Sequence, residues 1–204
     1  MSGRRRGRPP ATSSDDTRRG LVDAARLHFA TVGYDAASLT SIAADAGLTT
    51  TATYHYFEGK AELFESVARD TIDLVWVGLL DRVAEADTLS DQVEAFLSGA
   101  DDVGADDRLL SAFLVSVPVE ARRTPAFEPV LRELAGRQGA VFDHMAATGL
   151  ATGELRDLGH GEASAMLRML LLGWSYETHY QPEYRSVRAD VVRSAVAWWG
   201  RRTG

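Results

Sequence analysis

Apolar positions recur at helical spacing along most of the chain, and no segment alternates for long like a half-buried strand. The pattern predicts an amphipathic helix over 17–32, which Gly33 ends. A short helix follows Ser38, a third covers 50–56, and a long fourth runs from about 59 to 86. Further helices are predicted over 89–98, 106–117, 125–147, 161–180 and 186–201. We therefore predict an all-α fold.

The stretch from Ser38 to Phe64 has the local signals of two short helices joined by a tight turn. The Ser38 hydroxyl can accept a free amide of the first helical turn. Gly47 follows the last apolar position, where a left-handed residue ends a helix at little cost. Thr49 can then cap the next helix. This arrangement predicts a helix-turn-helix, whose second helix enters the DNA major groove, although an ordinary helical hairpin is the alternative.

The composition of the second helix favours the DNA-binding interpretation. Its sequence, Thr-Thr-Thr-Ala-Thr-Tyr-His-Tyr-Phe, has poor helix formers and only Phe57 as an obvious apolar anchor. Hydroxyl groups suit phosphates and base edges better than a protein core. We predict groove contacts from Thr49, Thr50, Thr51 and Tyr54. We predict phosphate contacts from Thr40, His55, Tyr56 and Lys60, the last at a helix N-terminus.

Residues 17–64 resemble the N-terminal domain of TetR/AcrR-type transcriptional regulators. The matching positions are Ile42, Ala43, Ala46, Gly47, Tyr54, Tyr56, Phe57, Lys60 and Leu63. Leu48 and Thr49 stand where that family has Val-Ser, Thr51 replaces a small residue, and Thr53 replaces Leu or Ile. The resemblance covers about a quarter of the chain. It implies a helix-turn-helix domain followed by a helical domain that binds a small molecule and dimerises through its last two long helices.

The charge distribution agrees with DNA binding at the N-terminal end. The whole chain carries −7, but residues 1–64 hold eight Arg and Lys against seven Asp and Glu. That segment therefore has a net charge of +1, and the remaining 140 residues carry −8. Such asymmetry suggests separate tasks for the two parts.

The first sixteen residues hold four arginines and almost nothing apolar, which is typical of a segment that does not fold alone. Arg-Gly-Arg-Pro-Pro at 6–10 resembles an AT-hook core. Extended arginine side chains fit the negative potential of a narrow minor groove. We predict a flexible arm whose minor-groove contacts come from Arg4, Arg5, Arg6 and Arg8. A solvated tail without a role is the alternative.

The last two helices are apolar over more than one face. Such helices must bury one face in their own core and another against a partner, so we predict a homodimer. The predicted interface residues are Met166, Leu167, Leu170, Leu171, Trp174, Val191, Ala195 and Trp198. Wide core helices in a monomer are the alternative. Candidates for a ligand pocket are Trp76, Phe113, His144, Met145, Met169, Tyr176 and His179, although each of these residues could simply fill the core.

Several classes of chemistry find no support in the chain. Cysteine is absent, which excludes disulfides and thiolate chemistry. The histidines lack metal-site spacing, no glycine-rich phosphate loop is present, and the segment 173–177 lacks the second glycine of a nucleophile elbow. We expect no cofactor, no metal and no catalysis. No apolar run can span a bilayer, so we expect a soluble cytoplasmic protein with no membrane partner.

Three segments follow: a basic arm (1–16), a helix-turn-helix DNA-binding domain (17–64) and a helical ligand-binding and dimerisation domain (65–204). We predict a sequence-specific transcription regulator, a homodimeric repressor that leaves a palindromic operator when a small apolar or amphipathic effector binds. One alternative is a ligand-independent DNA-binding protein of the same fold. The other is a helical small-molecule-binding protein without a DNA function.

Overall fold

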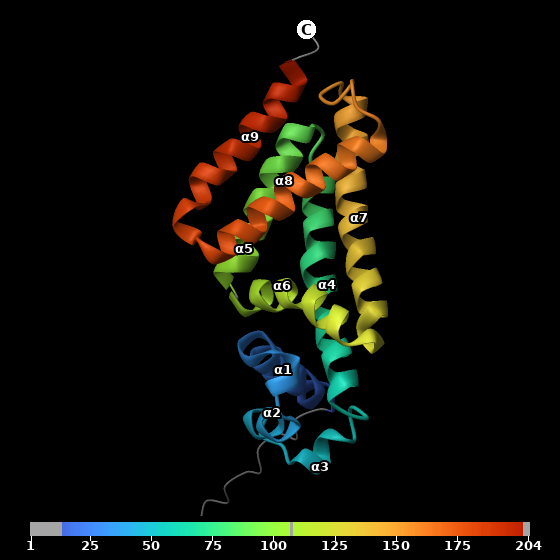
Figure 1. Ribbon diagram of the computed structural model, residues 1–204, viewed down its shortest axis with the longest axis vertical. Helices are drawn as coiled ribbons and strands as arrows, with labels where there is room; N and C mark the ends of the chain where they lie inside the picture. The colour runs from blue at the N-terminus through green and yellow to red at the C-terminus, as the bar shows by residue number, and fades with distance from the viewer. Residues whose placement is uncertain (1–13, 107, 202–204) are drawn as a thin grey trace, which may run out of the picture. The chain divides into compact units, whose positions relative to one another are not determined.

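The chain divides into two compact units, residues 1–64 and residues 65–204, which we call the N-terminal unit and the C-terminal unit. The computed structural model describes residues 14–106 and 108–201, so the arginines predicted to form an arm lie outside the described residues. Helices and turns account for these ranges, and no strand occurs within them (Figure 1). The predicted all-α fold is confirmed. Among the described helices, none is both long and apolar enough to cross a membrane.

The N-terminal unit contains α1 (Ser14–Ala36), α2 (Leu39–Asp45), α3 (Thr50–Thr53) and the first turn of α4 (Lys60–Ala84). Gly33 has φ 77° and ψ 170°, so the regular helix breaks at this glycine as the sequence predicts. The unit has a core of its own. Its fully buried large side chains are Leu21, Phe29, Ile42, Leu63 and Phe64. The rings of Phe29 and Phe64 meet edge to face with their centroids 5.2 Å apart, a favourable aromatic geometry.

The C-terminal unit is built from the rest of α4 and a series of longer helices. These are α5 (Leu89–Asp106), α6 (Arg108–Arg123), η1 (Pro125–Phe127), α7 (Glu128–Ala151), α8 (His160–Tyr180), η2 (Pro182–Tyr184) and α9 (Arg185–Arg201). Helix α8 packs against both α7 and α9, while α5 contacts α6, α7 and α9 (Figure 1). Ion pairs fasten α4 to α7, with Asp73 and Arg137 2.7 Å apart.

Two helix breaks that the sequence predicts are wrong. Gly99 lies inside α5, where an added Cβ would come within 2.8 Å of the Leu79 side chain. This glycine therefore allows α5 to approach α4 closely instead of ending the helix. Pro118 lies inside α6, which continues to Arg123 although the ring removes one backbone donor. Helix α3 is shorter than predicted and gives way to a turn after Thr53.

Candidate DNA interface and effector cavity

The connection between α2 and α3 has the geometry that the sequence predicts. The Ser38 hydroxyl accepts hydrogen bonds from the backbone amides of Thr40 and Ser41 at 3.2 and 3.4 Å. Gly47 has φ 71°, a left-handed conformation that favours glycine. The Thr49 hydroxyl then accepts the Ala52 amide at 3.2 Å. The start of each helix thus has a capping hydroxyl, and the turn between the helices has a left-handed glycine.

Two buried side chains anchor the short helix α3 to the unit. Thr53 and Phe57 are both more than nine-tenths buried. The Thr53 hydroxyl donates to the Thr50 carbonyl at 2.7 Å, so its polar atom is satisfied while the side chain fills the core. The guanidinium of Arg18 lies 5.1 Å from the centre of the Phe57 ring, a cation–π distance. A buried threonine therefore anchors this helix, at the position where the resemblance leads us to expect leucine or isoleucine.

The predicted groove residues remain accessible on the opposite side of α3. Thr49, Thr51, Tyr54 and His55 are exposed, and Tyr54 keeps 57% of its surface. Thr50, Tyr56 and Lys60 are intermediate in burial, and Thr40 on α2 is exposed. The Thr50 hydroxyl donates to the Thr40 hydroxyl at 3.3 Å, and this exposed hydrogen bond links α3 to α2. Contacts from these side chains to DNA stay predictions.

Lys60 has a different role from the predicted phosphate contact. Its ammonium group donates to the carbonyl oxygens of Tyr34, Asp35 and Ala37 at 2.8, 3.1 and 3.0 Å. These three bonds use all the donors that a lysine has. The ammonium also lies 4.5 Å from the centre of the Tyr34 ring. Lys60 therefore fastens the start of α4 to the end of α1, and the phosphate assignment is corrected.

Two further features tie α1 to its surroundings. The His28 ring nitrogen Nε2 lies 2.7 Å from the Asp45 carboxylate, which links α1 to the end of α2. Burial, reinforced by the charge of Asp35, raises the pKa of the Tyr34 phenol and so keeps it neutral beneath Lys60. These contacts hold α1, α2 and the start of α4 together within the N-terminal unit.

The C-terminal unit contains a cavity of about 580 Å³, within the range of small-molecule sites. Its wall comes from α4, α5, α6, α7 and α8. The apolar lining residues are Val75, Trp76, Leu79, Phe96, Ala100, Val103, Leu114, Val115, Pro118, Val119, Leu134 and Leu172. The remaining lining residues are Ser111, Gln138, Gly173, Ser175, Tyr176, Glu177 and His179. Buried side chains such as Trp76 and Phe96 lie deep in the wall, whereas Tyr176 and Glu177 are exposed.

Three of the seven predicted pocket residues, Trp76, Tyr176 and His179, line this cavity. The other four do not. Phe113 and Met145 are fully buried in packed core, His144 lies beyond the part of α7 that lines the cavity, and Met169 is 71% exposed. The sequence missed lining residues such as Phe96, Leu134 and Gln138. Helical periodicity identifies an inward face but cannot distinguish a residue that packs from one that borders a cavity.

The predicted dimer interface stays a prediction, and its residues differ in exposure. Met166, Leu167, Leu171 and Trp174 are buried within the chain itself, where they pack in its core. Leu170 and Ala195 are half-buried, while Val191 and Trp198 are exposed. The sequence missed other large exposed apolar or aromatic residues on the same part of the chain. These are Met169, Tyr176, Tyr180, Tyr184 and Val187.

Comparison with known proteins agrees with this geometry. Residues 21–67 match the family model described as bacterial regulatory proteins, tetR family. A crystal structure of the transcriptional regulator FadR from Bacillus subtilis with stearoyl-CoA shares 18% identity over 90% of this chain and 97% of that one, with a TM-score of 0.68. Salmonella enterica GusR shares 21% identity over 93% and 97% of the two chains, with a TM-score of 0.70.

A third similar structure comes from Pseudomonas aeruginosa PAO1. It has 18% identity to this chain, covers 94% of this chain and 96% of its own, and has a TM-score of 0.79. None of the curated proteins is significantly similar to the chain in sequence. At these identities the solved structures establish a shared fold over nearly the full length, whereas the family model concerns the helix-turn-helix.

Proposed function

We propose that this chain, which belongs to the TetR family of bacterial regulatory proteins, is a homodimeric repressor that leaves its operator when a small molecule enters the C-terminal cavity. It is a DNA-binding transcription regulator by family. The observation that carries the effector part of the proposal is the apolar cavity of about 580 Å³, because packed helical interiors rarely leave such a space.

DNA recognition is assigned to the exposed face of α3. Thr51 and Tyr54 present hydroxyl groups that can donate to or accept from base edges, and neither is committed to the core. Thr40 and His55 are placed to contact phosphates, which position the helix without reading sequence. Because Lys60 is held by backbone carbonyls, its contribution is to hold the start of α4 against the end of α1 and not to bind a phosphate.

Homodimer formation is assigned to α8 and α9. Met169 and Val191 are 71% and 61% exposed, and Tyr180, Val187 and Trp198 add further apolar surface on these helices. Exposed apolar side chains on two neighbouring helices support an interaction surface there. A two-fold dimer explains a palindromic operator, because paired reading helices about 34–36 Å apart meet successive major grooves.

The coupling is assigned to α4, since this helix belongs to both units. Its first turn carries Lys60 and the core residues Leu63 and Phe64, while Val75, Trp76 and Leu79 line the cavity. A ligand that binds one arrangement of α4 better than another shifts the population toward that arrangement. Coupling of about 1–3 kcal/mol would change operator affinity roughly 5- to 150-fold. The similar FadR structure holds stearoyl-CoA, which supports ligand-responsive regulation in this chain as well.

The proposal is tested by selecting bound DNA from a random pool with the full chain. We expect an inverted repeat whose half-sites are about one helical turn apart. Sedimentation of the complex should give two protein chains per DNA duplex. Selection of a single, non-repeated site by a monomer would contradict the dimeric model. A protein whose melting temperature responds to no compound would support a ligand-independent regulator of the same fold instead.

A further inference from the structure

We infer that the effector is an uncharged, mainly apolar molecule and that the cavity rejects anions such as carboxylates and phosphate esters. This inference rests on the proposed function, because it names the ligand class of the same cavity. It comes from the charges of the wall and of the groups behind it.

The buried part of the cavity wall is mainly apolar. Trp76, Leu79, Phe96 and Leu134 are buried side chains of the wall. The Trp76 and Phe96 rings lie 6.3 Å apart between centroids, and both rings also contact Phe142 behind them. Surfaces of this kind bind hydrocarbon chains or rings, because removing apolar area from water lowers the free energy of the system.

The polar lining groups suit an uncharged oxygen or nitrogen. Gln138 and Ser175 can each donate and accept hydrogen bonds, and Tyr176 carries a phenol. No lysine or arginine occurs among the described residues of the wall, while Glu177 brings a carboxylate to it. An anion placed there would gain no partner from a lysine or arginine of these wall residues. Burying an unpaired charge is strongly unfavourable.

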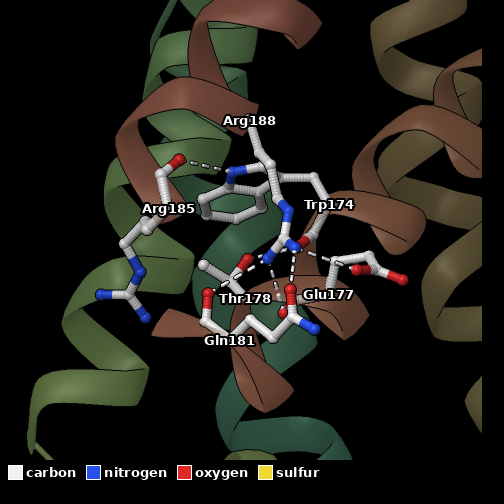
Figure 2. A network of polar contacts seen from close by, with 6 residues as sticks. All are labelled: Trp174, Glu177, Thr178, Gln181, Arg185 and Arg188. Atoms are coloured by element: carbon white, nitrogen blue, oxygen red, sulfur yellow. Dashed lines mark hydrogen bonds and ion pairs between the residues drawn. The ribbon is translucent and has the colours of Figure 1, made fainter. Parts of the chain in front are cut away.

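Arg188 on α9, which pairs with the wall residue Glu177, is already engaged (Figure 2). Arg188 donates to the carbonyl oxygens of Glu177 and Gln181 at 2.9 and 3.1 Å and to the Gln181 side chain at 2.7 Å. It also pairs with the Glu177 carboxylate at 3.2 Å. Recruiting Arg188 for an anionic ligand would break this network.

The same ion pair argues against a cationic ligand. Since Arg188 neutralises Glu177, the wall presents no uncompensated negative charge to attract an ammonium group. Arg137, which precedes Gln138 on α7, is likewise paired with Asp73 at 2.7 Å. Glu177 with Arg188, and Asp73 with Arg137, are therefore ion pairs within the protein, and an uncharged ligand disturbs neither pair.

The test compares ligands that share one chain and differ in charge: 1-decanol, decanoate and decylammonium. Their binding to the full chain is followed by tryptophan fluorescence, to which Trp76 in the wall responds. We expect 1-decanol to bind at least about tenfold more tightly than either ion. Equal or tighter binding of decanoate or decylammonium, or no binding of 1-decanol, would overturn the inference.

Two pairs of variants locate the effect in the cavity. Ala100→Leu fills part of the lining and should weaken 1-decanol binding at least about tenfold, whereas Ala147→Leu, an exposed change on α7, should not. Gln138→Lys supplies the missing cation and should raise decanoate affinity at least about tenfold. The exposed control Ala140→Lys should leave it unchanged. Failure of Gln138→Lys to favour decanoate over its control would contradict the charge argument.

The outcomes separate ligand class from function. If 1-decanol binds but operator affinity does not change, the ligand class stands and the proposed release mechanism fails. If decanoate binds more tightly and releases the operator, the release mechanism stands and the ligand class fails.

Discussion

The two units of this chain use their interiors in opposite ways. In the N-terminal unit, Phe29 and Phe64 pack ring against ring, and Lys60 joins two helices through three carbonyl oxygens. In the C-terminal unit, five helices surround a cavity of about 580 Å³. A unit that must present a reading helix in one geometry gains from rigid packing. A unit that must respond to a ligand gains from a cavity that the ligand can fill.

The exposed surfaces of the two units also differ, in their polarity. The exposed face of α3 is hydroxyl-rich, and Tyr54 and Thr51 suit a polar partner. The exposed parts of α8 and α9 are apolar and aromatic, as Met169 and Val191 show. Ring pairs such as Tyr176 and Tyr180, with centroids 4.8 Å apart, belong to this second surface. In the proposed function the first surface binds DNA and the second binds another copy of the chain.

The largest expected effect comes from removing packing in each unit. Phe29→Ala should destabilise the N-terminal unit by about 3–5 kcal/mol, because it leaves a cavity in a packed core. Leu114→Ala, in the cavity wall, should cost less than half as much, since Leu114 is half-buried and already borders a space. Chemical denaturation of both variants measures the difference. Equal losses would remove the contrast between the two interiors.

Lys60→Ala tests whether the three hydrogen bonds from Lys60 to backbone carbonyls stabilise the fold. We expect a loss of about 2 kcal/mol of stability in the N-terminal unit, because three carbonyls lose a charged donor. Operator affinity should fall for all sequences, while its dependence on salt stays as in the wild type. Filter binding over a range of salt concentrations gives the slope. If the slope of log affinity against log salt concentration were smaller by about 0.9 in the variant, Lys60 would contact a phosphate after all.

A substitution on the reading face should change preference without changing stability. Thr51 is exposed, so Thr51→Ala should leave the melting temperature unchanged and alter discrimination between operator variants by about 1–2 kcal/mol. The matched change Thr53→Ala removes a buried threonine of the same helix and should lower stability instead. Competition binding with single-base operator variants checks the first expectation. Uniform weakening across those variants would assign Thr51 to phosphates.

The smallest expected effect concerns acid stability of the C-terminal unit. Burial opposes ionisation of Glu154, but hydrogen bonds from Thr152, from the Leu89 amide and from Ser90 outweigh it and hold the pKa below its usual value. A lowered folded-state pKa gives stability above the ordinary glutamate range that is lost as pH falls through the lowered value. Glu154→Gln should cost about 1 kcal/mol at neutral pH and flatten this acid dependence. An unchanged profile in thermal melts across acidic pH would contradict this role.

Local signals made the N-terminal unit predictable from the sequence. Ser38, Gly47 and Thr49 act within a few residues of their own positions, so the sequence alone indicates their caps and turn. The role of Lys60 depends on carbonyls more than twenty residues away, and no local pattern reports them. The helix break predicted at Gly99 was wrong for the same reason, because this glycine permits a close approach to Leu79 on another helix.

The cavity and the exposed apolar residues of α8 and α9 were less predictable. Trp76, Tyr176 and His179 were identified by residue type, but Met145 and Phe113 have the same character and fill the core. In α8, apolar residues cover more than one face, so periodicity could not show which of them turn outward. Leu167 proved to be buried and Met169 exposed although they lie two positions apart.

The most direct test of the account measures operator affinity with the cavity filled and unfilled. The operator obtained by selection is titrated with the full chain, with and without saturating 1-decanol, while tryptophan fluorescence confirms that the ligand is bound. We predict weakening of operator binding by roughly 5- to 150-fold in the wild type and little response in Ala100→Leu. Operator affinity that stays the same while 1-decanol occupies the cavity would contradict the account.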